Sequence, residues 1–226
     1  MITSFDRLNE LNIERKSMPF DQYFGEMELS EVQIEDRKKV SRKLYELMLT
    51  LFEMVSIGVT ASIIDWDYLE KWLAVQIQII AADVYADGDD FFMGFYPTEK
   101  ARQIIDTTRR NTEASESVSE GSKERNKAYA LSKDRGMFIA ENEANTLYNR
   151  SEYVKALKAG YKYKTWRTKA DKHVRKTHVV IEGKTIPIES MFEVGMAQML
   201  YPKDELNAGD FPEEIVNCRC TVKYSK

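Results

Sequence analysis

The hydrophobic pattern of this chain changes its period near Lys162, and that change limits the folds open to it. Upstream, the large apolar residues recur at alternating steps of four and three, which is the spacing of one face of an α-helix. These residues are Val40, Leu44, Leu47, Leu51 and Met54. Downstream, residues 161–167 alternate with a period of two and are rich in aromatic side chains, which indicates a β-strand. We therefore predict an α+β protein, with a mainly helical N-terminal two-thirds followed by a small C-terminal β-containing module.

Helix caps and breaks predict five helices before that module. Ser30 and Gln33 form a capping box that opens the first, and Asp65 or Asp67 caps the second. The next three are expected over residues 97–111, 124–150 and 151–157, with Gly160 ending the last. In the module, residues 179–188 suggest a β-hairpin that turns at Glu182-Gly183, and residues 221–224 suggest a final strand.

Composition divides these elements into regions. Residues 112–123 are almost devoid of apolar side chains and are predicted to be a polar linker or loop. Residues 1–111 then form a helical region. Residues 124–226 form a second region, with a helical lead-in over 124–160 and a small α+β unit over 161–226.

The charge is distributed unevenly along the chain. Residues 1–100 have a balance of −9 and residues 101–226 a balance of +5, which together give the net charge of −4. The excess of basic residues is greatest over 151–180, where a solvated basic face or a DNA-binding face are the two interpretations. The candidate DNA contacts are Lys155, Lys158, Lys162, Lys164, Arg167, Lys169, Lys172 and Lys176.

Several classes of protein and of site are disfavoured. The two cysteines are two positions apart and cannot readily bridge to each other, so a reducing compartment is expected. Residues 1–15 lack the apolar stretch of a signal peptide, and polar residues with Gly58 interrupt the apolar segment 47–64, so no membrane association is expected. The acidic residues 87–90 lack the ligand pattern of an EF-hand and are predicted to form a solvated turn.

His178, Cys218 and Cys220 are the residues most able to carry chemistry. With His173 or Asp171 they could bind zinc, but Cys-x-Cys lacks a residue that the usual zinc knuckle contains. The alternative places the two cysteines on opposite sides of a strand, one of them buried. We therefore predict no cofactor, with zinc as the alternative.

Two other arrangements of these residues are open. Cys218 could be a nucleophile, with His178 as its base and Asp171 orienting the base, although no known nucleophile signature surrounds it. Asp171, Arg175 and His178 are spaced by four and three. On a helix, Asp171 could pair with Arg175 while His178 bonds to the closing strand, and we prefer this architectural interpretation.

An ordered set of residues in the module resembles a known family. The set closes on Asn-Cys-Arg-Cys and resembles the C-terminal signature of phage Mu F-like minor head proteins, also described as phage head morphogenesis proteins. It comprises Trp166, Asp171, Arg175, His178, Gly183, Tyr201, Pro202, Asp204, Asn217, Cys218, Arg219 and Cys220. The resemblance covers roughly residues 130–224. It departs from the family at Lys203, where glycine is frequent, and at His173, where a basic residue is common.

The resemblance implies a non-enzymatic minor head protein of a tailed phage, associated with the portal and other head proteins. It would act in head morphogenesis or DNA packaging and could contact double-stranded DNA. The expected location is the interior of the procapsid or virion, and the host cytoplasm during assembly. Two alternatives remain, namely a nucleic-acid-binding protein that acts through residues 151–180 and a metal- or Cys-dependent enzyme.

Overall fold

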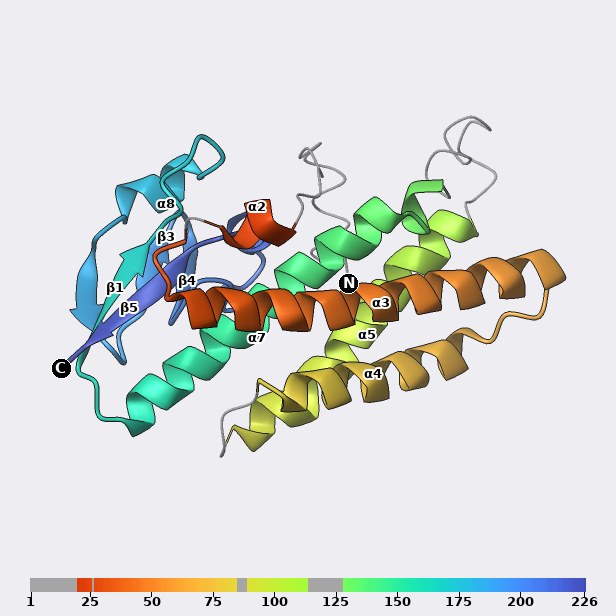
Figure 1. Ribbon diagram of the computed structural model, residues 1–226, viewed down its shortest axis with the longest axis horizontal. Coiled ribbons are helices and arrows are strands. Elements are labelled where there is room, and N and C mark those ends of the chain that lie inside the picture. Colours follow the sequence, from red (N-terminus) through yellow and green to blue (C-terminus); the bar gives the residue numbers. More distant parts are fainter. Residues whose placement is uncertain (1–19, 26, 85–88, 114–127) are drawn as a thin grey trace. The chain divides into compact units, whose positions relative to one another are not determined.

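The computed structural model describes residues 20–25, 27–84, 89–113 and 128–226, and its class is α+β as predicted (Figure 1). These residues form two compact units. One contains residues 20–41 and 141–226, and the other contains residues 42–140. The unit with the strands therefore includes a segment that the predicted boundaries assigned to the N-terminal helical region. Most of the predicted linker, residues 114–123, and half of the predicted acidic turn, residues 87 and 88, lie outside the described residues.

The helical unit contains most of α3 (Glu31–Ala61), α4 (Trp66–Ala82), α5 (Asp90–Thr112) and the first part of α7 (Lys133–Lys158). Asp65 caps α4 by accepting a hydrogen bond from the Tyr68 backbone N–H at 2.9 Å, which settles the choice between Asp65 and Asp67. The apolar face of α4 is buried at Leu69, Leu73 and Ile77.

Helix α5 begins earlier than predicted. Pro97 lies inside the helix and does not start it, because the preceding turns have their own buried aromatic pair. Phe92 and Tyr96 are buried one turn apart, and their rings stack with centroids 4.7 Å apart. The packing of this pair outweighs the lost backbone hydrogen bond that a proline within a helix entails.

The other unit begins with α2 (Phe20–Phe24) and the first turns of α3. The predicted capping box is present, since Ser30 Oγ accepts from the Gln33 N–H at 3.3 Å and Gln33 Oε1 accepts from the Ser30 N–H at 3.0 Å. The two helices predicted over 124–150 and 151–157 are one helix, α7. Ser151 is buried within it and does not interrupt it, and Gly160, at φ +72°, terminates it.

Five short strands form two sheets in this unit. The three-stranded sheet is antiparallel with the order β2-β1-β5, where β1 is Tyr163–Arg167, β2 is Thr185–Pro187 and β5 is Thr221–Ser225. Strands β3 (Phe192–Val194) and β4 (Ala197–Met199) form a separate hairpin, which the sequence reading missed. Trp166, in register with Val222, lies at the centre of the core with Phe192, Met199 and Tyr201.

The hairpin predicted over residues 179–188 was wrong. Residues Lys176–Val180 form a short helix, α8, and only β2 remains of the two predicted strands. β2 pairs with β1 and not with a strand from the same segment. Val179 and Val180, the β-branched residues that suggested a strand, are exposed, whereas His178 is buried. The segment is helical because this turn directs the imidazole into the core.

Helix α3 contains an 18-residue window with a mean hydropathy of 1.4, so it is long and apolar enough to cross a membrane. Core helices of soluble proteins meet the same criterion. In this helix 33% of that window is buried, including Leu44, Met48, Leu51 and Val55.

Candidate functional site

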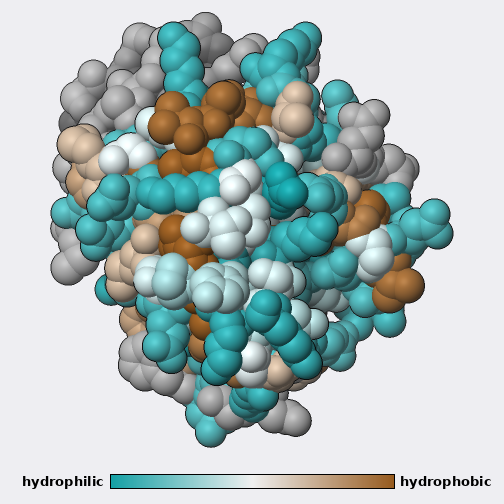
Figure 2. Space-filling view, turned by 90° about the vertical axis from the view of Figure 1, so that its left-hand side faces the viewer, coloured by the Kyte–Doolittle hydropathy of each residue, from teal (hydrophilic) through white to brown (hydrophobic). Residues whose placement is uncertain are grey.

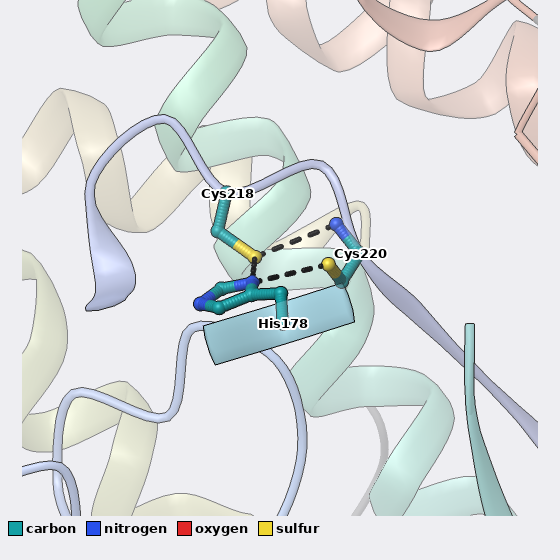
Figure 3. Close-up of side chains that lie close together, drawn as sticks. All are labelled: His178, Cys218 and Cys220. Carbon is teal, nitrogen blue, oxygen red and sulfur yellow. Dashed lines mark hydrogen bonds between the residues drawn. The ribbon is translucent and has the colours of Figure 1, made fainter. Parts of the chain in front are cut away.

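The three residues that the sequence analysis selected as candidates for chemistry lie together in the unit that contains the strands. His178 projects from α8, and Cys218 and Cys220 lie on the segment that leads into β5 (Figure 3). The His178 Nδ1 atom is 3.3 Å from Cys220 Sγ and 3.6 Å from Cys218 Sγ. All three side chains are buried, and the cysteines do not form a disulfide. The prediction that the cysteines occupy opposite sides of a strand was therefore wrong, since both sulfur atoms lie beside one imidazole ring.

Glu214 holds the other side of the imidazole. Its Oε2 atom is 3.0 Å from His178 Nε2 and accepts a hydrogen bond from Thr177 Oγ1 at 2.8 Å. Glu214 belongs to α9 (Pro212–Ile215). Glu214 was not among the predicted site residues, and the sequence predicted Asp171 as the residue that orients His178. No spacing signal connects Glu214 to His178, because 36 positions separate them.

Asp171 has a different partner. Its carboxylate accepts two hydrogen bonds from the Arg219 guanidinium, at 2.6 and 2.8 Å. The predicted Asp171–Arg175 pair is replaced by this contact, and Arg175 donates to the backbone carbonyl of Val216. Burial favours a higher pKa for Asp171, but the Arg219 hydrogen bonds and the His173 backbone N–H lower the pKa below its ordinary value.

The charges in the site are coupled. Burial lowers the pKa of His178, but the Cys218 sulfur and the Glu214 carboxylate raise it more, to about 9. Burial raises the pKa of the Cys218 thiol, but a hydrogen bond from Cys220 and the charge of His178 bring it well below its usual value. Burial and the neighbouring Cys218 raise the pKa of Cys220. The pKa values of these three groups are therefore interdependent, because each depends on the charge of its neighbours.

Three asparagines on α7 fix the backbone of the Asn-Cys-Arg-Cys segment. Asn142 Oδ1 accepts from the N–H of Asn217 at 2.5 Å, and Asn145 Nδ2 donates to the carbonyl of Cys218 at 3.0 Å. Asn149 Nδ2 donates to the carbonyl of Cys220 at 3.2 Å. We call these three residues the asparagine row. The row was not predicted from the sequence. Its spacing of three and four on a predicted helix nevertheless indicates three side chains on one helical face.

The other residues of the ordered set that resembles the phage Mu F-like signature lie around His178, Cys218 and Cys220 or support the backbone near them. Trp166 packs edge-on against His178, with ring centroids 5.6 Å apart. Its indole nitrogen is buried and has no hydrogen-bond partner among the described residues. Gly183, at φ +72°, donates its N–H to the Trp166 carbonyl at 2.9 Å. Asn217 is in the left-handed region, at φ +58°, where asparagine is tolerated.

Tyr201, Pro202 and Asp204 lie on a separate turn after β4. The Pro202 carbonyl accepts from Asn149 at 3.1 Å, so one asparagine joins this turn to the cysteine segment. Asp204 Oδ2 accepts from the Leu200 N–H at 2.9 Å. Lys203 stands at φ +66°, in the left-handed region that glycine adopts more readily than other residues. Its buried ammonium donates to Asn142 Oδ1 at 2.8 Å.

The eight candidate DNA contacts separate by exposure. Lys155, Lys158, Lys162, Lys172 and Lys176 are exposed. Lys164 is not available, because its side chain is buried and Nζ donates to the Leu200 carbonyl at 2.5 Å. Arg167 forms ion pairs with Glu28 and Glu182, and Lys169 donates to the backbone carbonyls of Gln22 and Tyr23. Five of the eight predicted contacts are therefore open to a ligand.

The comparisons with known proteins bear on the same region. No curated protein and no solved structure matches the chain. A family described as "Phage Mu protein F like protein" matches residues 96–223. The match begins within α5, earlier than the resemblance noted from the sequence, and runs to β5. It includes the asparagine row, His178, Glu214 and both cysteines. Since it covers more than half of the chain, the protein belongs to the phage Mu F-like family.

Proposed function

We propose that the protein is a minor component of a tailed-phage head and acts in head morphogenesis. The observation that carries this proposal is the family match over residues 96–223, which takes in the whole site. The geometry supports a structural role for that site. Its charged groups, Asp171, His178, Glu214 and Arg219, are bonded to one another or to neighbouring side chains, and its sulfur atoms are covered, with 2% of Cys218 and 3% of Cys220 exposed.

The partner proposed for this protein is the portal, together with other head proteins. Figure 2 shows the side that carries the C-terminal strands, where hydrophilic residues dominate and hydrophobic ones form separate patches. Val180 and Met196 are the most exposed of the large hydrophobic residues in this unit, at 83% and 74%. Exposed apolar side chains within a polar surface suit a contact between proteins that also fold separately.

Co-purification with the portal protein of the same phage tests this proposal. Tagged portal protein should retain the chain, and quantitative mass spectrometry should find the chain in procapsids at low copy number. Protease treatment of intact heads should leave it uncut if it lies inside. Absence from procapsids and virions, or its digestion in sealed heads, would contradict the corresponding part of the proposal.

DNA binding is a second proposal, which the five exposed lysines favour. They form two groups along the chain, with Lys155, Lys158 and Lys162 before β1 and Lys172 and Lys176 after it. Lys155 lines a groove of about 580 Å³ that also contains Glu28 and Glu152, and these carboxylates reduce its attraction for phosphate. We therefore assign the stronger phosphate contacts to Lys158 and Lys162 in the first group and to both lysines of the second.

Binding to double-stranded DNA at several salt concentrations tests this second role. K158A/K162A and K172A/K176A should each weaken binding and reduce its dependence on salt by about two counterions. K71A, which removes an exposed lysine from the helical unit, is the control and should leave binding unchanged. Binding that does not fall with salt, or that K71A weakens equally, would contradict DNA contact through this segment.

We propose that the protein is not an enzyme. A cysteine nucleophile must reach its substrate, and both sulfur atoms lie beneath the surface. Alkylation of the native chain should therefore be slow at both cysteines compared with the unfolded chain. Rapid alkylation of Cys218 in the folded protein would reopen the catalytic alternative.

A further inference from the structure

The donor atoms of His178, Cys218 and Cys220 have the spacing of a metal site. The three lie within 4.8 Å of one another. A tetrahedral zinc ion with Zn–S near 2.3 Å and Zn–N near 2.0 Å separates a sulfur and a nitrogen ligand by about 3.5 Å. The two distances from Nδ1 to sulfur are 3.6 and 3.3 Å. We propose that these three residues bind one Zn²⁺ ion through His178 Nδ1 and the two Sγ atoms.

The ligand types select this class of metal. Two thiolates and one imidazole form a soft, nitrogen-containing set that suits zinc, whereas calcium and magnesium require oxygen ligands. The charge of the ion also accounts for two buried thiolates. A divalent cation neutralises two thiolates, whose isolated burial would otherwise carry a large desolvation cost.

Neighbouring residues orient the proposed ligands through hydrogen bonds, as they do in known metal sites. Metal-binding histidines generally donate their second ring nitrogen to a carboxylate or carbonyl, which fixes the ring. Here the Glu214 carboxylate takes that place, 3.0 Å from Nε2, and Thr177 fixes the carboxylate in turn. The Cys220 backbone N–H donates to Cys218 Sγ at 3.4 Å, so one sulfur already has a donor (Figure 3).

The backbone explains how a Cys-x-Cys pair can serve as ligands. A zinc knuckle uses an extra residue to turn both sulfur atoms toward the ion. In this chain the asparagine row and the left-handed Asn217 fix the backbone from outside, so the turn does not depend on the residue count. Both sulfur atoms consequently approach the same side of His178.

A small hollow lies beside the three ligands. Lys169, His173, Arg175 and Arg219 contribute to its lining. The His173 side chain is exposed, and the described residues provide no fourth donor atom within the cluster. The proposed site is therefore limited to three protein donor atoms.

Metal analysis of the purified full-length chain tests the site. After reconstitution with Zn²⁺ under reducing conditions and removal of free metal, one zinc ion should remain for each chain. C218S, C220S and H178N should each reduce the retained zinc at least several-fold. H173A, which replaces the only other histidine, is the matched control and should retain zinc in full.

Cobalt substitution of the unaltered chain gives a test that does not depend on how the variants fold. Bound Co²⁺ should show a thiolate-to-cobalt charge-transfer band and the intense d–d bands of tetrahedral coordination. Zinc far below one ion for each chain, a cobalt spectrum without the thiolate band, or full retention of zinc by C218S/C220S would each overturn the assignment. Loss of zinc in H173A would overturn the choice of three protein ligands.

Discussion

At the scale of single residues, the site consists of buried polar side chains that each serve a distant backbone group. Asn149 is the clearest case, because its one amide nitrogen donates to the carbonyls of Pro202 and Cys220. A paired buried polar group adds little to the free energy of unfolding, but removing its partner lowers that free energy considerably. The residue-scale predictions therefore concern removal of a partner.

Replacing Asn149 by alanine should lower the free energy of unfolding by about 2–4 kcal/mol, because two buried carbonyls lose their donor. Urea unfolding followed by circular dichroism measures this loss. N111A is the control. Asn111 is half-buried near the end of α5 and donates to its own helix, so the change should stay within about 0.5 kcal/mol. Equal losses in the two variants would contradict the bracing role of Asn149.

Gly195→Ala should disturb Glu214 directly. A Cβ at Gly195 would lie 2.5 Å from Glu214 Oε1 and 3.2 Å from Thr177 Cγ2, and the residue has φ +62°. Glu214 can retreat only by weakening its bonds to His178 and Thr177. G183A is the control, since Gly183 has φ +72° but nothing within 4 Å. Both variants should lose about 1–2 kcal/mol to backbone strain, and G195A about 1–2 kcal/mol more. Equal unfolding midpoints for G195A and G183A would show that His178 and Thr177 do not fix the position of Glu214.

Lys164 should make stability depend on pH. Burial lowers the pKa of its ammonium to about 8 from an ordinary 10.5. Between those values the unfolded chain binds more protons than the folded one, so this residue makes stability rise with pH from about 8 to 10.5. Below pH 8 its destabilising contribution is complete.

K164M should abolish that rise. Other groups titrate in the same range, so the measurement is the difference in unfolding free energy between the wild type and K164M at several pH values. That difference should change by about 2–3 kcal/mol between pH 7.5 and 10.5. A difference that is constant with pH would show that the Lys164 ammonium is not desolvated.

At the scale of elements, the first turns of α3 are joined to the second half of α7 by a buried ion pair. Arg37 is completely buried and donates two hydrogen bonds to the Glu152 carboxylate, at 2.9 and 2.8 Å. Gln33 donates to the same carboxylate at 2.8 Å. This contact links residues 115 positions apart. It is one reason why the N-terminal turns of α3 belong to the compact unit that holds the site.

R37M should therefore destabilise the protein by about 3–5 kcal/mol, because Glu152 loses the charge that compensates its partial burial. The double variant R37M/E152M should recover part of this loss, as a double-mutant cycle in urea would show. R102M is the control, since Arg102 is half-exposed and pairs with Glu99 within the same helix, so its loss should change stability by at most about 0.5 kcal/mol. No recovery in the double variant would contradict a direct pair.

At the scale of the whole molecule, the compact unit that holds the site is not one consecutive stretch of chain, because residues 42–140 separate its two parts. Helices α3 and α7 each contribute residues to both units. The site accordingly depends on the N-terminal part of the chain. The hydroxyl of Tyr23 in α2 donates to the Cys218 carbonyl at 3.2 Å, although 195 positions separate them. A fragment limited to residues 124–226 lacks this contact and the Arg37–Glu152 pair.

Zinc binding at the proposed site should protect one unit more than the other. A ligand that binds only the folded state slows the openings that expose its site. Hydrogen exchange should therefore slow on zinc addition in β1, β5 and the second half of α7, and change little in α4. Uniform slowing along the chain would show that the two units open together, and no change anywhere would contradict a metal site in the folded protein.

The sequence by itself determined the features that depend on neighbouring residues. The cap at Ser30, the buried face of α3, strands β1 and β5, and the α+β class all follow from local periodicity and capping chemistry, which also narrowed the cap of α4 to Asp65 or Asp67. The ordered set that ends at Cys220 also led to the family. Prediction was wrong where local propensity competed with packing, as at Pro97 and over residues 179–188.

Only the tertiary structure decided the partners of the buried polar groups. Arg219 and not Arg175 meets Asp171, Glu214 and not Asp171 meets His178, and the asparagine row meets the cysteine segment. Periodicity records which face of an element is buried, but it does not record what lies opposite that face. A buried donor or acceptor must be satisfied by whichever distant group the packing brings to it. The identity of that group is therefore a property of the assembled fold.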